Sequence, residues 1–251
     1  MNHTIQSLWI GPELSKLEQL SIKSFIDNGH DYHLYVYDTV KNVPAGTVIK
    51  DANEILDKSE IFYYKNGSVA AFSNLFRYTL MYKRGGYWAD TDCICVRPFH
   101  FDNEIVIASE PDSSYKKNII TTSLLRLKQG SDALLAAIKI QAMHKTLIQA
   151  GKLPWGSGTK TVTALVDIFK LEDSILPWKT VCTCYYEDYK SLLDPNYSKS
   201  QNAIQRLKDI PLEMVCFHMY NELFRREKID KNGTFHPDSL YEIFKRKHNI
   251  I

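Results

Sequence analysis

The 251-residue sequence lacks an excess of charge of either sign, because 31 Lys and Arg residues face 29 Asp and Glu residues for a formal net charge of +2. Proteins dedicated to nucleic-acid binding usually carry a strong basic excess, so we expect no nucleic-acid partner. Hydrophobic residues make up 44% and charged residues 24%, which are ordinary values for folded domains. Intrinsic disorder is therefore excluded as the main state.

Long apolar runs and a leader are also lacking. No run reaches the roughly 18 apolar residues that a membrane-spanning helix requires, and the first 14 residues lack the basic start and apolar stretch of a signal peptide. The odd number of cysteines favours reduced thiols and a cytoplasmic location. Two Cys-x-Cys pairs allow two interpretations, a structural zinc site or cysteines buried in strands. The spacing speaks against zinc, because zinc-binding thiols are usually separated by about two to four residues. The cysteines are Cys93, Cys95, Cys182, Cys184 and Cys216.

Apolar periodicity and turn signals predict an α/β protein. A first strand, helix and second strand with short connections make a parallel sheet the expected arrangement. A buried helical stripe follows Gly67, where Ser68 is the expected cap, and ends at Gly85-Gly86. We expect strands at 4–10, 32–37, 87–96, 103–108, 119–125, 181–186 and 214–218. Further helices are expected at 15–27, 131–149, from the 153–159 loop to 169, and after an Asp238 cap to 248.

The stretch SNLFRYTLMYKRGGYWADTD, residues 73–92, carries the chemistry. Asp90 and Asp92 stand two apart at the expected strand end, and a period of two places both carboxylates on one side of the chain. Converging carboxylates repel unless a cation neutralises them, and Mg²⁺ or Mn²⁺ prefers such oxygen ligands. D-x-D alone is common at strand ends exposed to solvent. A solvated strand end that binds no metal therefore remains the alternative interpretation.

The helix before this pair carries Asn74 and Arg77 three residues apart, hence on neighbouring surface positions. We expect helix and strand end to meet at the double glycine, so that Arg77 and Asn74 reach sugar hydroxyls beside a metal. The alternative is that Arg77 lies along the helix surface as an ordinary exposed side chain and has no part in a site.

The pattern R-Y-x₆-G-G-x-W-A-D-x-D after a helix, with Leu8-Trp9-Ile10-Gly11 near the start, resembles glycosyltransferase family 32. This is the glycosyltransferase sugar-binding region containing the DXD motif, and it is related to the clostridial glucosylating toxins. The resemblance implies a GT-A fold, a Rossmann-like α/β domain with a mixed central sheet that occupies residues 1–251. The nucleotide-sugar and metal-binding half is expected over about 1–100, and the acceptor-binding half over about 101–251.

The resemblance also implies roles for individual residues. Asp92 is expected to bind Mn²⁺ or Mg²⁺ directly, and Asp90 to bind the ribose, the donor sugar or the metal through water. Asn74 stands where relatives usually carry Asp, which puts the choice of donor in doubt. The remaining implied contacts are Trp9, Ile10 and Gly11 for the nucleotide, Arg77 for the donor sugar, Trp88, Gly158 and Thr159 of the WGSGT segment for the sugar or acceptor, and His218 for the metal or diphosphate. A core Trp9, a helix-starting turn at Gly158 and a structural His218 are the alternatives.

The implied activity is metal-dependent, retaining transfer of a hexose from a nucleotide-diphosphate sugar, with a UDP-sugar favoured. The implied acceptor is a glycan or lipid-linked saccharide in bacterial surface polysaccharide (capsule or lipopolysaccharide) biosynthesis. Two alternatives remain: an inactive glycan- or nucleotide-binding domain, and a phosphoryl or nucleotidyl transferase, which lacks the Gly-rich phosphate loop. The basic C-terminal helix at 238–248 predicts either peripheral contact with the inner membrane face or a packed helix with a solvated tip.

Overall fold

A six-stranded mixed sheet forms the centre of the computed structural model, which describes residues 3–153, 157–197 and 202–250. The strands are β1 (Ile5–Trp9), β2 (Tyr32–Val36), β3 (Val48–Asp51), β4 (Tyr87–Ala89), β5 (Cys93–Cys95), β6 (Val106–Pro111), β7 (Asn118–Arg126) and β8 (Cys216–His218). In the sheet order β3-β2-β1-β4-β7-β6 the first four strands run parallel, and β7 and β6 are antiparallel additions. Strands β5 and β8 form a separate antiparallel pair. The mixed α/β fold expected from the sequence is confirmed.

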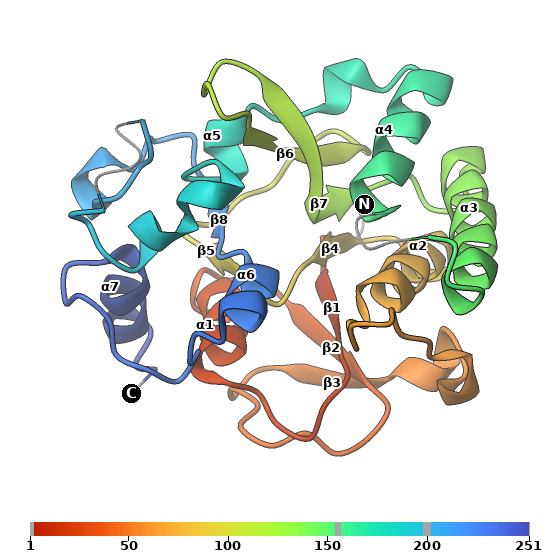
Figure 1. Ribbon diagram of the computed structural model, residues 1–251, viewed down its shortest axis with the longest axis horizontal. Helices are drawn as coiled ribbons and strands as arrows, with labels where there is room; N and C mark the ends of the chain where they lie inside the picture. The colour runs from red at the N-terminus through yellow and green to blue at the C-terminus, as the bar shows by residue number, and fades with distance from the viewer. Residues whose placement is uncertain (1–2, 154–156, 198–201, 251) are drawn as a thin grey trace.

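Helices cover both faces of the central sheet. They are α1 (Lys16–Asp27), α2 (Ala70–Arg84), α3 (Asp132–Gln149), α4 (Ser157–Phe169), α5 (Trp178–Val181), α6 (Asn221–Glu227) and α7 (Leu240–Lys247). Figure 1 shows α2, α3 and α4 on one side, and α1, the β5–β8 pair, α6 and α7 on the other. One hydrophobic cluster lies under α2 to α4, and two others lie on the α1 side. The sheet is therefore the middle of three layers.

Helix α2 forms where the apolar stripe predicts it. Phe72, Phe76 and Leu80 are fully buried on the sheet side. The helix ends at Gly85, whose φ of 67° lies in the left-handed region and whose N–H bonds to the Met81 carbonyl. Val69, and not Ser68, occupies the N-cap position, but the Ser68 hydroxyl still accepts the Ala70 N–H at 3.3 Å at the start of the helix.

The expected continuous strand at 87–96 is wrong. Strand β4 ends at Ala89, and the chain then turns, with the Cys93 N–H bonded to the Asp90 carbonyl at 3.0 Å, before β5 begins in the other sheet. The carboxylates of Asp90 and Asp92 therefore converge across a turn and not by strand alternation. This difference brings the second carboxylate towards β8.

Other boundaries also differ. The expected strand at 181–186 is wrong, because α5 occupies its start and a 3₁₀ helix begins at Tyr186. The apolar residues there are buried without pairing into a sheet. Strand β7 extends about as expected, whereas β6 begins and ends three residues later than the expected 103–108. Strand β3 and helix α6 were not foreseen. The last helix is capped by Ser239 and not by Asp238, since the Ser239 hydroxyl accepts the Glu242 N–H.

All five cysteines are free and buried. Three of them lie in β5 and β8, whereas Cys182 and Cys184 lie in the irregular segment after α5. Among the residues that the structure describes, the one group able to hold a metal contains no cysteine. The structure therefore supports buried thiols and gives no support to a zinc site.

The basic C-terminal helix α7 packs into the molecule. Leu240, Tyr241 and Phe244 have at most 1% of their surface exposed, and Lys245 is buried against Glu242. The apolar face that membrane contact requires is therefore occupied by the protein core. Within the described ranges, every helix is too short or too polar to span a bilayer.

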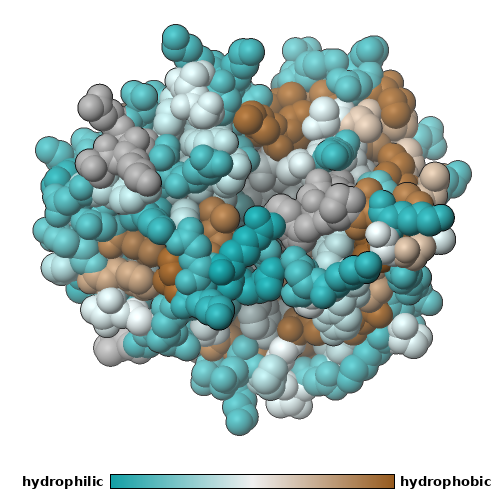
Figure 2. Space-filling model, viewed as in Figure 1, coloured by the Kyte–Doolittle hydropathy of each residue, from teal (hydrophilic) through white to brown (hydrophobic). Residues whose placement is uncertain are grey.

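The outer surface of the α3 layer is partly apolar. Met143 and Ile168 are 66% and 64% exposed, and Figure 2 shows hydrophobic residues gathered on the side where α3 and α4 lie, while the centre of that face is more hydrophilic. Apolar side chains of both α3 and α4 are therefore exposed on this side of the molecule.

Acid is expected to destabilise the fold through His30. The ring is buried beside Phe99, at 4.5 Å between ring centroids, and near His100. Burial, aided by the His100 charge, lowers the pKa of His30 to about 4. The folded state therefore binds fewer protons than the unfolded state below about pH 6.5, and stability is lost as the pH falls from there towards 4. We expect His30 to cost about 2 kcal/mol of unfolding free energy between pH 7 and pH 5.

Urea unfolding of the parent and of His30→Phe at both pH values measures this cost. The variant should lose clearly less stability than the parent on acidification. An unchanged difference between the two pH values would contradict the assignment.

Candidate active site

A pocket of about 700 Å³ opens where β1 and β4 end, between α2 and the start of α6. Most of the residues singled out in the sequence line it, which brings together segments from both halves of the chain. Gly11 is not among the lining residues. Of the WGSGT segment, Trp155 and Gly156 lie outside the described residues. The expected residues that do line the pocket are Trp9, Ile10, Asn74, Arg77, Trp88, Asp90, Asp92, Gly158, Thr159 and His218.

Asp90 is held by α2 and by its own strand. Its Oδ1 accepts hydrogen bonds from Arg77 Nη2 at 3.0 Å and from Trp88 Nε1 at 2.7 Å. Arg77 is 5% exposed, lies 4.7 Å from the centroid of the Trp88 ring and donates through Nη1 to the Thr122 carbonyl. Burial raises the pKa of Asp90, and the Arg77 guanidinium opposes that shift. Both donors use Oδ1, so the second carboxylate oxygen stays available to a ligand.

Trp88 lines the pocket, and only 2% of the residue is exposed. Its indole N–H donates to Asp90, and the Arg77 guanidinium lies over its ring. The indole therefore supports the charged pair, and its contact with a sugar stays a prediction.

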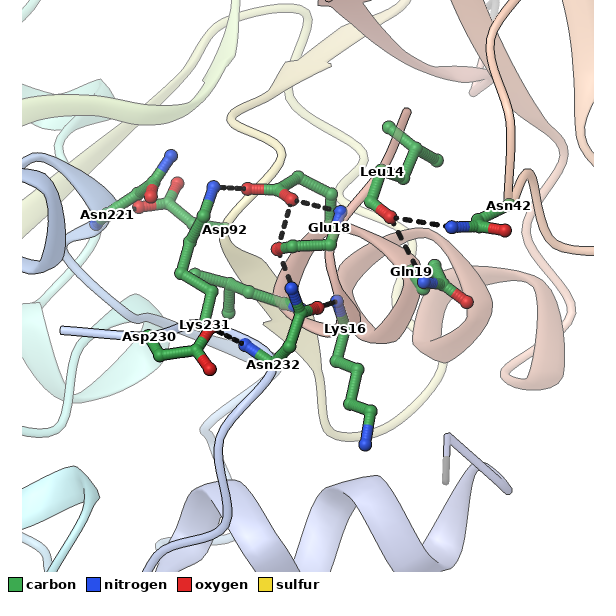
Figure 3. Close-up of polar contacts among 12 residues, drawn as sticks. Leu14, Lys16, Glu18, Gln19, Asn42, Asp92, Asn221, Asp230, Lys231 and Asn232 are labelled. Carbon is green, nitrogen blue, oxygen red and sulfur yellow. Dashed lines mark hydrogen bonds and ion pairs between the residues drawn. The ribbon is translucent and has the colours of Figure 1, made fainter. Parts of the chain in front are cut away.

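Asp92 is joined to the C-terminal part of the chain. Its Oδ2 lies 3.1 Å from His218 Nε2 and accepts the Asn221 N–H at 2.7 Å, a contact whose two residues appear in Figure 3. Its carbonyl accepts the Met219 N–H. Burial alone would raise the pKa of Asp92, but the His218 ring and the Asn221 N–H hold it below the usual value.

His218 follows from the pairing of β8 with β5, which sets it opposite Cys93. Tyr220 then adopts a left-handed φ of 56° at the N-cap of α6, and its ring lies 4.5 Å from the His218 ring, centroid to centroid, at a tilt of 52°. Burial would lower the pKa of His218, yet Asp92, Asp90 and Glu110 together raise it to about 9. The three carboxylates therefore favour a positive charge at this position, carried by the ring or by a bound cation.

The residues present fit a divalent metal. One ligand atom from each of Asp90, Asp92 and His218 lies within 4.8 Å of the others. Adjacent ligands of a six-coordinate Mg²⁺ or Mn²⁺ stand about 3 Å apart, close to the 3.1 Å between Asp92 Oδ2 and His218 Nε2. Carboxylate oxygens with one imidazole suit such an ion.

Sequence reasoning missed several residues of the pocket. Glu110 from β6, Thr122 from β7 and Tyr220 with Asn221 after β8 all line it. Burial raises the pKa of Glu110. The Tyr220-Asn221-Glu222 run shortly after His218 was a usable signal for Asn221. Glu110 gave none, because its neighbours depend on the antiparallel pairing of β6 with β7.

The Trp9 side chain lies at the mouth of the pocket. Its indole N–H is buried without a partner among the described residues, and the Lys231 ammonium lies 5.6 Å from the ring centroid. A Cβ on Gly11 would stand 3.2 Å from Trp9 Nε1. Gly11 thus acts on the pocket through the Trp9 ring.

Lys231 also pairs with Glu18, as Figure 3 shows. Glu18 has 0% of its surface exposed and accepts the Ser15 N–H at 2.8 Å in the capping box of α1. Replacing Lys231 with Met leaves a buried carboxylate without its cation, so we expect a loss of about 3 kcal/mol of unfolding free energy. Urea unfolding measures the loss.

Lys16→Met is the matched control, since the hydrogen bond of Lys16 to Asn232 uses its backbone N–H. Equal stability of the two variants would show that the Lys231–Glu18 pair contributes nothing.

Part of the chain resembles a known family. Residues 15–112 match the family described as glycosyltransferase sugar-binding region containing DXD motif. The match covers this segment and not the rest of the chain. The matched DXD region contains Asn74, Arg77, Asp90 and Asp92, while His218 and Gly158 lie beyond it.

Solved structures show the fold beyond the DXD region. Glycosyltransferase GlyE of Streptococcus pneumoniae TIGR4 superposes with a TM-score of 0.54 at 12% identity, over 98% of this chain and 61% of that chain. Its apo form gives 0.54 at 14% identity, over 99% and 60%. The fold is therefore of the GT-A type, and the chain spans less than two thirds of GlyE. PaToxG glycosyltransferase matches at 16% identity over 68% and 72%, with a TM-score of 0.48. None of the curated proteins matches the sequence significantly.

Proposed function

We propose that this chain is a metal-dependent glycosyltransferase that moves a hexose from a nucleotide-diphosphate sugar to a saccharide acceptor. The observation that carries the proposal is the cluster of Asp90, Asp92 and His218 at a pocket also lined by Arg77 and Trp9. The DXD family of residues 15–112 supports a nucleotide-sugar donor.

The pocket residues serve two purposes, which are to bind the donor and to stabilise negative charge on the leaving diphosphate. Asp90, Asp92 and His218 hold Mn²⁺ or Mg²⁺, which when bound neutralises charge on the leaving diphosphate. Arg77 holds Asp90 in place and presents its remaining N–H groups to the donor sugar. Trp9 offers its ring to the base, and Ile10 packs beside it. Fixed charges of this kind at the leaving group usually supply the largest contribution to rate.

The donor, the stereochemistry and the acceptor can each be proposed more specifically. We propose a UDP-sugar as donor, retention at the anomeric carbon, and a glycan or lipid-linked saccharide acceptor in assembly of a bacterial surface polysaccharide on the cytoplasmic side. Residues about 1–100 would serve the donor and metal, and the remainder of one domain, with Gly158 and Thr159, the acceptor. The apolar face of α7 is buried in the protein. We therefore do not propose that this helix contacts a membrane.

Two other functions make different predictions. An inactive binding domain is favoured by Asn74, which stands where an acidic residue is usual and carries no charge. A nucleotidyl or phosphoryl transferase would use the same carboxylate pair. The transferase is preferred because Arg77 and Asn74 extend the metal cluster along α2 on the pocket wall.

A donor panel separates these functions. The protein is incubated with UDP- and GDP-sugars and Mn²⁺, with EDTA as the control, and products are resolved by chromatography. Release of free nucleoside diphosphate that EDTA abolishes supports the proposal. Donor binding without turnover supports the inactive domain, and release of sugar 1-phosphate supports the nucleotidyl transferase.

A further inference from the structure

The first turn of α4 lies directly against Asn74. A Cβ built on Gly158 would stand 2.7 Å from Asn74 Nδ2, 3.0 Å from Oδ1 and 3.1 Å from Cγ. Separations under 3.0 Å are not tolerated, so either the backbone or the Asn74 amide must shift if any other residue replaces Gly158. The backbone of Gly158 is helical and its φ is not positive. A need for conformational freedom therefore does not explain why residue 158 is glycine. The close approach of the backbone to Asn74 does explain it.

The Asn74 amide is held in the pocket by packing. The residue is 6% exposed, and no described residue forms a hydrogen bond with its side chain. It lines the pocket together with Gly158, Thr159 and Arg77. Its donors and acceptor have no partner among the described residues, so they are available to a ligand in the pocket. Its orientation depends on whatever packs against it.

We propose that Gly158 is a positioning residue that fixes the Asn74 amide toward a hydroxyl group of the donor sugar. The glycine lets α4 close on one face of the amide, and the other face remains directed at the pocket. The inference rests on the proposed function, since it assigns the sugar end of the donor to this wall. It explains how a neutral amide serves at this position: a hydroxyl both donates and accepts, and an oriented amide matches both.

The test compares Gly158→Ala, Asn74→Ala and the double variant. The added methyl turns the amide away at the end of a short side chain, while alanine improves helix propensity, so the melting temperature of Gly158→Ala should change by less than about 5 °C. We expect at least a roughly tenfold loss of kcat/KM with the best UDP-sugar, as for Asn74→Ala. The double variant should be no worse than Asn74→Ala, because the methyl then has no amide to displace. Lys160→Ala, on the exposed side of the same turn, should match the parent.

Calorimetric titration gives a readout that needs no turnover. Affinity for UDP alone should be unchanged in all variants, and the additional affinity for the UDP-sugar should fall equally in Gly158→Ala and Asn74→Ala. Normal sugar affinity in Gly158→Ala overturns the inference, as do losses that multiply in the double variant. Absence of turnover by the parent on every donor defeats the proposed function instead, and the titration still decides whether Gly158 and Asn74 act as a pair.

Discussion

Asp92→Asn is expected to lower kcat/KM at least about 100-fold, because it removes one fixed charge from the metal cluster. The neutral amide keeps the size of the side chain, and its oxygen can still accept the Asn221 N–H. What is lost is the attraction for the cation and for the His218 ring 3.1 Å away. Steady-state release of nucleoside diphosphate at saturating Mn²⁺ gives the rate, and the Mn²⁺ concentration needed for half-maximal activity should rise as well.

The control for this variant is Asp238→Asn, which removes a carboxylate from an exposed position near α7. It should retain parental activity and parental dependence on Mn²⁺. Ordinary turnover by Asp92→Asn would show that the carboxylate has no part in the reaction.

Arg77→Met is expected to damage both stability and activity. The substitution leaves Asp90 without its cation and the Thr122 carbonyl without its donor in a buried setting. Removing one member of a buried ion pair costs about 3–5 kcal/mol, which urea unfolding measures. Activity at a temperature where the variant remains folded should fall at least about 100-fold. Arg77→Lys should recover part of the stability, since a single ammonium cannot serve both acceptors.

The double variant Arg77→Met/Asp90→Asn separates charge from packing. Asparagine removes the uncompensated carboxylate, so the double variant should be more stable than Arg77→Met alone. If it is less stable by the sum of both single losses, Arg77 acts by packing on Trp88 and not through Asp90.

The sequence was sufficient to predict the half of the site that one continuous segment builds. A helix with an apolar stripe, a double glycine and a buried strand lie next to one another along the chain, so Asn74, Arg77 and Asp90 follow from local periodicity and turn chemistry. Asp92 was placed on the correct side for the wrong reason, because the alternation of Asp90 and Asp92 resembles a strand while the backbone turns between them.

The other half depends on contacts that no local pattern encodes. His218 meets Asp92 because β8 pairs with β5, two segments more than 100 residues apart in sequence. Glu110 enters the pocket because β7 turns back antiparallel to β6. The segment at 181–186 has the composition of a strand, but Cys182 and Cys184 are buried by packing alone. Composition thus predicted their burial and could not predict which partner they would have.

The proposed activity depends on a cation held by Asp90, Asp92 and His218 beside the paired phosphates of a nucleotide sugar. A crystal structure of the protein with Mn²⁺ and UDP-glucose, with anomalous diffraction to locate the manganese, tests this directly. We expect an anomalous peak bound by Asp92 and His218, with Asp90 as a direct or water-bridged ligand, and diphosphate oxygens completing the shell. A well-ordered nucleotide sugar elsewhere, or one in the pocket with no manganese at these residues, would contradict it.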